Sequence, residues 1–231
     1  MKKQTLFFLI LIPFLAFPFS SNELPDNDLD KLNKGEMILI KRDVEGSVWP
    51  EITIYKKIEV TPLEATAIFM AFDHQKNYVV DVTKSDPVKM DSPTSIIVDY
   101  ERKNPWPVPN EAYSNMHIFK KVENGYHIKW WSLTSNNTSK VVGDAYFVDF
   151  KGKTLLRYKI EVHPKLGIAG MFTGTMIEKT RDGIEGIADY IFFAKDNLPD
   201  LMKKYKTMLK DSLKGKWSYK ALIKPLPKEK K

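Results

Sequence analysis

The sequence of 231 residues contains no cysteine. This absence excludes disulfide bonds, a lipid-modified N-terminal cysteine, a thiol nucleophile and a thiolate metal site. A chain without such cross-links has to be stabilised by the packing of its hydrophobic core alone. That requirement favours a single well-packed domain.

Motifs that carry metal or catalytic chemistry are also missing. The four histidines do not have the spacing of metal ligands, and no His-Glu-x-x-His sequence occurs. No Gly-x-Ser-x-Gly nucleophile elbow is present. The segment Gly152-Lys153-Thr154 is not a phosphate loop, because Phe147 stands where the first glycine is needed. The sequence therefore predicts no metal, no cofactor and no catalytic residue.

A strong excess of charge is absent from the body of the chain. The formal net charge is +7, but Lys2, Lys3 and the last seven residues account for most of it, which leaves about +3. No stretch interleaves basic and aromatic residues as a nucleic-acid platform does. Nucleic acid is therefore not expected as a partner.

The longest uncharged apolar run covers residues 6–19 only. It follows two lysines and precedes two serines, which is the order of a secretory signal peptide. A retained membrane anchor is the alternative, but about 14 residues interrupted by two prolines fall short of the ~20 that cross a bilayer. We expect residues 1–21 to be a signal peptide and the protein to be exported, either to a periplasm or as a secreted protein.

Past this leader, strand and helix signals follow one another. Residues 22–46 indicate a linker, with residues 22–34 polar and acidic and open also to a first turn of helix, and with a short strand candidate at 37–42. Residues 51–60 alternate in polarity, which predicts a strand with one buried face. The sequence Thr61-Pro-Leu-Glu64 then predicts a helix start with a capping box, and the helix continues to about Asp73.

The middle of the chain predicts a meander of antiparallel strands joined by short polar turns. Asn124-Gly125 is a hairpin signal, because both residues can adopt the positive φ of the favoured turn. The candidate strands cover residues 78–88, 95–102, 113–123, 125–134, 140–150 and 154–163. One continuous apolar concave face is predicted from Ile96, Val98, Tyr100, Tyr126, Ile128, Trp130, Tyr146, Val148, Phe150, Leu156, Tyr158, Ile160 and Val162.

The C-terminal quarter changes to helical spacing. Apolar residues recur at intervals of three and four from Ile168 to about Leu213. Two glycines and Pro199 leave open whether this is one kinked helix or several pieces, and Gly215 is a plausible stop. Residues 215–231 are expected to form a loose basic tail.

The order of these elements predicts an α+β domain in which the last helix covers the apolar face of the sheet. This order resembles the START domain and its helix-grip superfamily, which includes polyketide cyclase-like proteins. The segment Asn104 to Asn110, with Trp106 between two prolines, is similar to the family's Pro-Trp-Pro segment, although Glu111-Ala112 replaces the usual Arg-Asp pair. The first helix at 61–72 and the turn that follows the last strand at 158–170 are similar as well.

The resemblance implies a curved antiparallel sheet of about seven strands wrapped round a long C-terminal helix, over residues 47–214. It also implies a tunnel that holds one lipid, sterol or other small apolar ligand. The polar stretch 134–140 lies where the family carries a loop over the tunnel entrance, although an ordinary turn fits equally well. The candidate lining residues are Tyr100, Trp130, Tyr146, Arg157, Tyr158, Ile184, Ile187 and Ile191, with Asp144 and His127 as further polar contacts.

Three functions remain open from the sequence. The first is an exported protein that binds or transfers one apolar molecule. The second is a cavity enzyme of the cyclase or hydrolase kind, with His127 or Asp144 as general base. The third is an envelope interaction module whose aromatic residues simply fill a solid core. The Trp106 loop and the basic tail are candidates for transient contact with an anionic membrane.

Overall fold

The computed structural model describes residues 26–104 and 106–224. The signal peptide predicted for residues 1–21 and the last seven residues of the predicted tail lie outside the described residues. Within the described ranges, no helix has both the length and the apolar character needed to cross a membrane.

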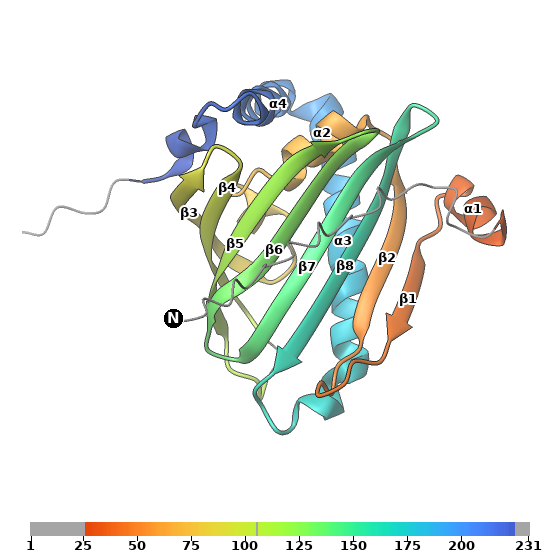
Figure 1. The fold of residues 1–231 in the computed structure, drawn as a ribbon. Coiled ribbons are helices and arrows are strands. Elements are labelled where there is room, and N and C mark those ends of the chain that lie inside the picture. The colour runs from red at the N-terminus through yellow and green to blue at the C-terminus, as the bar shows by residue number, and fades with distance from the viewer. Residues whose placement is uncertain (1–25, 105, 225–231) are drawn as a thin grey trace, which may run out of the picture.

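The described residues form eight strands in one antiparallel sheet, in the order β1-β2-β8-β7-β6-β5-β4-β3 (Figure 1). Consecutive strands from β3 to β8 pair with each other, which confirms the predicted meander. The pairing of β2 with β8 brings the start of the chain beside its last strand. The strands are β1 (Ile38–Arg42), β2 (Glu51–Ile58), β3 (Val82–Ser92), β4 (Ser95–Arg102), β5 (Glu111–Val122), β6 (Gly125–Ser135), β7 (Thr138–Phe150) and β8 (Lys153–Pro164).

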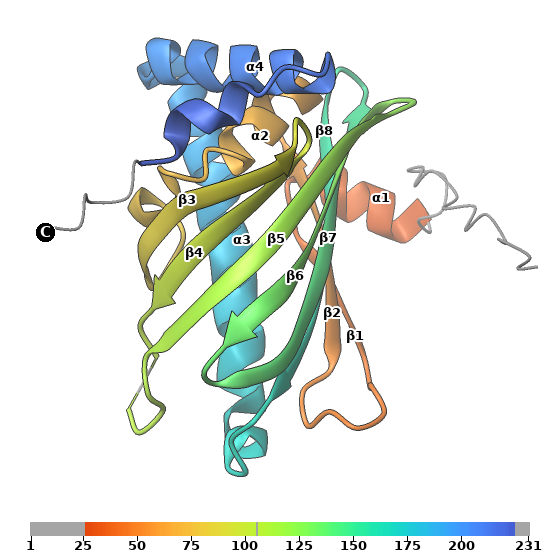
Figure 2. The same cartoon turned by 60° about the vertical axis from the view of Figure 1, so that its left-hand side comes forward.

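A long helix crosses the concave face of this sheet, which confirms the predicted fold class. Figure 1 shows α3 behind the strands, and Figure 2 shows α2 and α4 covering one end of the molecule. The short helix α1 packs on the convex face, where Leu29 and Leu32 contact the sheet. The helices are α1 (Asp26–Asn33), α2 (Pro62–Phe69), α3 (Thr173–Asn197) and α4 (Pro199–Leu213), with short 3₁₀ turns η2 (Gln75–Asn77), η3 (Ala169–Phe172) and η4 (Ser218–Leu222).

The predicted capping box starts α2. The backbone N–H of Glu64 donates to Thr61 Oγ1 at 3.4 Å, and the backbone N–H of Thr61 donates to Glu64 Oε2 at 3.1 Å. Pro62 lies in the first helical turn, where backbone N–H groups have no intrahelical acceptor, so the absence of an N–H on proline costs no hydrogen bond. Two of the free donors at this helix end are thereby satisfied.

Pro199 divides the C-terminal helical region, whereas the two glycines inside α3 do not break it. Pro199 begins α4, because proline cannot donate to the preceding turn of α3. Gly215 follows α4 with φ at +87°, and the backbone N–H of Lys216 donates to the carbonyl of Asp211 at 3.0 Å. The predicted stop at Gly215 is confirmed.

The β5–β6 hairpin forms as predicted, but the conformation predicted for its turn is wrong. Gly125 pairs with Val122 inside the ladder and does not have positive φ. The positive φ values lie instead at Lys151 (55°) and Gly152 (78°), in the turn between β7 and β8. Gly125 is required for a different reason, since a Cβ there would lie 1.9 Å from the carbonyl oxygen of Phe147.

The face predicted for β7 is also wrong. Ala145 and Phe147 belong to the core on the concave side, while Tyr146, Val148 and Phe150 belong to a second cluster on the convex side. Residues 145–148 of this strand are all apolar, so the alternation cannot choose a face there. The helix α1 buries the convex set, which an uncovered sheet would leave in water.

The strand candidate at 37–42 is confirmed as β1, an edge strand of the sheet. The C-terminal segment is more ordered than the sequence predicted. The expectation of a loose tail is wrong for η4, where Tyr219 is fully buried and Leu222 is buried as well. The ring of Tyr219 contacts those of Phe72 and Phe119, with centroid distances of 6.0 and 5.6 Å.

Candidate ligand-binding cavity

A cavity of about 270 Å³ lies between the concave face of the sheet and α3. Its walls come from strands β3 to β8 and from one side of α3. It reaches the loops at the end of the molecule opposite α4 (Figure 2). Loop residues at this mouth are Trp49, Asn104, Val108, Leu166 and Phe172.

The inner wall is apolar. Trp130 and Tyr158 lie side by side on β6 and β8, with ring centroids 5.3 Å apart, and face Ile184 and Ile187 of α3. Gly143 on β7 leaves room for the Trp130 ring, since a Cβ at this position would lie 2.3 Å from that ring. A side chain in place of this glycine hydrogen would therefore force the indole to move.

Four of the eight predicted lining residues are in the cavity wall, namely Trp130, Tyr158, Ile184 and Ile187. Tyr100 and Ile191 are buried in the adjoining core and do not line the cavity. The Tyr100 hydroxyl donates to Gln75 Oε1 at 2.7 Å, so this group already has a partner.

Tyr146 and Arg157 lie on the convex face of the sheet, away from the cavity. The Arg157 guanidinium stands over the Tyr146 ring at 4.6 Å from its centroid and forms an ion pair with Asp144. The ring of His127 also stacks on the Tyr146 ring, with centroids 4.0 Å apart. Burial lowers the pKa of His127 to about 4, so its ring is neutral at neutral pH. The polar residues predicted to contact the ligand, Arg157, Asp144 and His127, thus lie together, but on the convex face of the sheet and not in the cavity.

Sequence reasoning missed the polar residues that do line the cavity. Arg102 continues the alternation of residues 96–100 on the inner face of β4, and Asn115 occupies the inner register of β5. Their Nε and Oδ1 atoms are buried without a hydrogen-bond partner. A polar residue in register with apolar ones was the signal available in the sequence.

The two tyrosines near Arg102 remain protonated. Burial raises the pKa of Tyr113 to about 12, although the nearby Arg102 charge opposes this rise. Burial likewise raises the pKa of Tyr158, again opposed by Arg102. Both phenol groups therefore enter the cavity as neutral hydrogen-bond donors at neutral pH.

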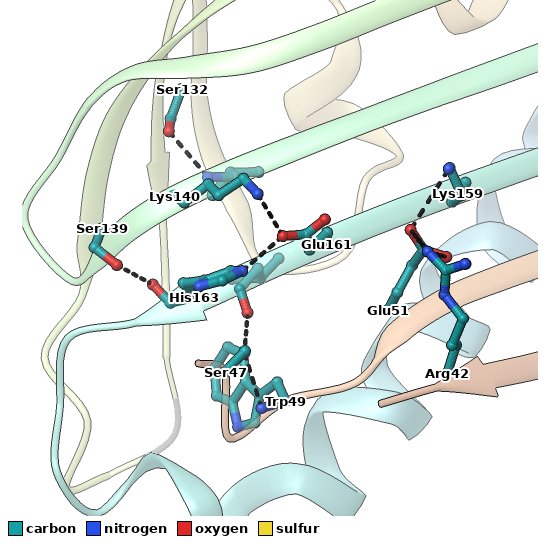
Figure 3. Close-up of polar contacts among 12 residues, drawn as sticks. Arg42, Ser47, Trp49, Glu51, Ser132, Ser139, Lys140, Lys159, Glu161 and His163 are labelled. Carbon is teal, nitrogen blue, oxygen red and sulfur yellow. Dashed lines mark hydrogen bonds and ion pairs between the residues drawn. The ribbon is translucent and has the colours of Figure 1, made fainter. Parts of the chain in front are cut away.

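Hydrogen bonds fix Trp49 at the cavity mouth (Figure 3). Ser47 Oγ donates to the carbonyl of Val162 at 3.1 Å and accepts from the backbone N–H of Trp49 at 3.1 Å. The indole Nε1 of Trp49 donates to the carbonyl of Ala169 at 2.8 Å. The Ser47 and Trp49 side chains thereby link the β1–β2 loop to strand β8 and to η3.

The predicted polar loop at 134–140 is a short turn between β6 and β7. Asn136 Oδ1 accepts from the backbone N–H of Ala112 at 3.0 Å, and Asn137 Nδ2 donates to the carbonyl of Pro109 at 2.8 Å. These bonds tie the turn to the segment before β5, so it forms a fixed part of the mouth.

In the part of the chain that the structure describes, no group of three or more histidine, aspartate and glutamate residues could hold a metal ion. The unpartnered polar atoms around Arg102 are therefore the main chemical feature of the cavity.

No protein-family profile and no curated protein sequence matches this chain. Solved structures do match. The STAR-related lipid transfer protein (fragment 25–204) from Xanthomonas axonopodis is 14% identical and aligns with a TM-score of 0.60, over 67% of this chain and 93% of that one. Human STARD10 is 10% identical with a TM-score of 0.59, over 81% and 86% of the two chains.

The lipid transfer and protein localization domain of human StarD13 is 11% identical, with a TM-score of 0.55 over 72% of this chain and 94% of that one. At such low identity the likeness concerns the fold. The same antiparallel sheet and the same long helix across it recur in each of these proteins. The chain therefore has the START-like helix-grip fold.

Proposed function

We propose that this protein binds and carries one small apolar molecule between its sheet and α3. The observation that supports this most directly is the cavity of about 270 Å³, since well-packed cores contain few voids larger than a water molecule. Mostly apolar walls with a few polar groups are typical of small-molecule sites. Two of the structurally similar proteins, the one from Xanthomonas axonopodis and the human StarD13 domain, are described as lipid transfer proteins, which is consistent with the proposal.

A cavity-filling variant tests it. Gly183 lines the cavity from α3, and a Cβ at this position would meet no heavy atom within 4 Å. Gly183→Leu is expected to fill the space and to abolish binding of an apolar probe such as dodecanol, while the helix gains stability because leucine is a better helix former than glycine.

Gly174→Leu is the matched control, because Gly174 lies on the same helix, has the same open surroundings and does not line the cavity. Binding should be unchanged in this variant. Equal affinity of wild type and Gly183→Leu would contradict the carrier function, as would wild-type protein that neither binds dodecanol nor yields any apolar molecule on extraction. In that case the envelope interaction module becomes the better interpretation.

The cavity-enzyme alternative loses its named candidates. His127 and Asp144 lie on the convex face, separated from the cavity by the sheet itself. A general base has to lie within hydrogen-bond reach of the proton that it removes. We therefore favour a carrier without catalytic activity.

We further propose that the chain is exported after cleavage of residues 1–21, as the charged, apolar and small-polar order of its N-terminus indicates. The intact mass of protein isolated from the exported fraction should match a chain that begins near Ser21. Full-length protein in the membrane fraction would support the anchor alternative instead.

The carrier is also expected to meet a membrane surface transiently at the cavity mouth. Trp106 is 91% exposed and Met171 is 83% exposed, on two of the loops that surround the mouth. Trp106→Ala should weaken binding to anionic liposomes in a flotation assay. Trp217→Ala is the control, because Trp217 is half exposed but lies next to η4 at the other end of the molecule. Equal loss in both variants would contradict a role for the mouth.

A further inference from the structure

We propose that Arg102, Tyr113, Asn115 and Tyr158 form a binding site for an oxyanion head group, a carboxylate or a phosphate, on a single-chain amphiphile. The apolar chain of this ligand lies against Trp130, Ile184 and Ile187. This inference rests on the proposed carrier function and specifies which ligand class the cavity takes.

The central observation is the state of Arg102. Its Nε atom is buried, and its side chain makes no hydrogen bond or ion pair with any described residue. Arg102 as a whole is partly exposed, and the part of a cation that is removed from water is stabilised when an opposite charge or hydrogen-bond acceptors replace the water. A planar guanidinium matches the two oxygens of a carboxylate or phosphate, which it binds through paired N–H donors.

Three further groups share the cavity with Arg102. The hydroxyls of Tyr113 and Tyr158 have no hydrogen-bond partner among the described residues, and their protonated state makes them donors. Asn115 is only 6% exposed and its Oδ1 has no partner. Its amide lines the same cavity and carries both a donor and an acceptor. The Arg102 charge acts on both tyrosines, and a cation beside neutral donors favours an anion.

The other charges at the cavity are already engaged. Lys179 forms an ion pair with Asp81. Glu111 Oε1 accepts from Ser135 Oγ at 2.7 Å and from Thr138 Oγ1 at 3.2 Å, which holds it toward the β6–β7 turn. Although Glu111 is the cross-strand neighbour of Arg102, no ion pair joins them. Arg102 is thus the cavity-lining cation that lacks a carboxylate partner in the described ranges.

The size of the cavity limits the apolar part of the ligand. A volume of about 270 Å³ is at the low end of the ~300–1,000 Å³ typical of small-molecule sites. A single alkyl chain fits such a space, whereas the two chains of a membrane phospholipid need considerably more. The site therefore favours a fatty-acid-like or alkyl-phosphate-like molecule.

Matched probes with the same chain test this inference. Isothermal titration of the purified protein with dodecanoate, dodecyl phosphate and dodecanol, below their aggregation concentrations, compares a carboxylate, a phosphate and an uncharged head. We expect one or both anions to bind at least tenfold more tightly than dodecanol, and the stronger of the two identifies the head group. Arg102→Gln should remove this preference while leaving the affinity for dodecanol within about twofold of wild type.

Arg42→Gln is the control for loss of one positive charge, because Arg42 lies on β1 with an exposed side chain and does not line the cavity. It should keep the full preference for the anions. Circular dichroism melts establish that each variant is folded. If Arg102→Gln is unstable, Arg102→Lys replaces it, and because it retains the charge it should keep part of the preference.

Equal affinity of wild type for dodecanol and for the anions would overturn the head-group inference but leave the carrier function standing. Absence of binding by all three probes would overturn both.

Discussion

Gly143 and Trp130 are cross-strand partners on β7 and β6, and the indole occupies the space that a Cβ at residue 143 would need. We expect Gly143→Ala to push the ring toward the cavity and to lower the free energy of unfolding by about 1–3 kcal/mol, as overpacking does. Urea unfolding measures the stability, and titration with dodecanol measures the accompanying loss of affinity.

Gly167→Ala provides the comparison for this change. Gly167 lies in the loop before η3, does not have positive φ, and a Cβ there would have no heavy atom within 4 Å. Its substitution should leave both stability and affinity near the wild-type values. If the two alanine variants behaved alike, the close contact between Gly143 and Trp130 would not explain the requirement for glycine.

His117 makes stability depend on pH. This residue is 5% exposed, and burial lowers its pKa to about 3, compared with ~6.5 in an unfolded chain. Between these two values the unfolded chain binds a proton that the folded protein does not, so stability falls as pH falls through this window. The contribution of His117 is a loss of about 2 kcal/mol between pH 7 and pH 5.

Urea unfolding at pH 7 and pH 5 measures this dependence. Other groups titrate in the same range, His127 among them, whose burial lowers its pKa to about 4. The comparison of wild type with His117→Gln therefore isolates the contribution of His117. The free energy of unfolding of the variant should change less between pH 7 and pH 5 than that of wild type, by the amount that corresponds to about one bound proton. The same change in both proteins would refute the assignment to His117.

At the scale of elements, η4 contributes to the core although it lies beyond the last long helix. Tyr219 packs between Phe72, which follows α2, and Phe119 of β5. Tyr219→Ala removes a fully buried aromatic ring and should lower the free energy of unfolding by about 3–5 kcal/mol.

Lys224→Ala is the matched change in the same C-terminal segment. Lys224 is exposed and pairs with Asp86 at 3.2 Å, so its loss should cost at most about 1 kcal/mol. Thermal melts of both variants compare the two effects. Similar melting temperatures for Tyr219→Ala and wild type would mean that η4 does not stabilise the domain.

At the scale of the whole molecule, the sequence contained enough information for the meander from β3 to β8 and for the helix that covers it, but not for the pairing of β2 with β8. Regular alternation and short turns specified the antiparallel meander, and the change to helical spacing specified the element that covers it. The bounds predicted for β4, residues 95–102, coincide with those observed. These signals are local, which is why a single sequence shows them.

The assignment of faces and of the cavity residues could not follow from local signals. Tyr146 and Phe147 are both large and apolar, and the packing of α1 on the distant convex face decides which of them points outward. Half of the residues predicted to line the site therefore lie in the cavity wall. Arg102 was readable in principle, because its register is that of the apolar residues before it, but only the fold shows that its Nε atom is buried without a partner.

The closed end formed by α2, α4 and η4 has a kinetic consequence. A cavity with one opening must release its ligand before it can bind another, so under the proposed carrier function both molecules pass Trp49 and Phe172. Ligand exchange is then stepwise, with release before uptake. Delivery by this protein would then consist of separate round trips, one molecule at a time.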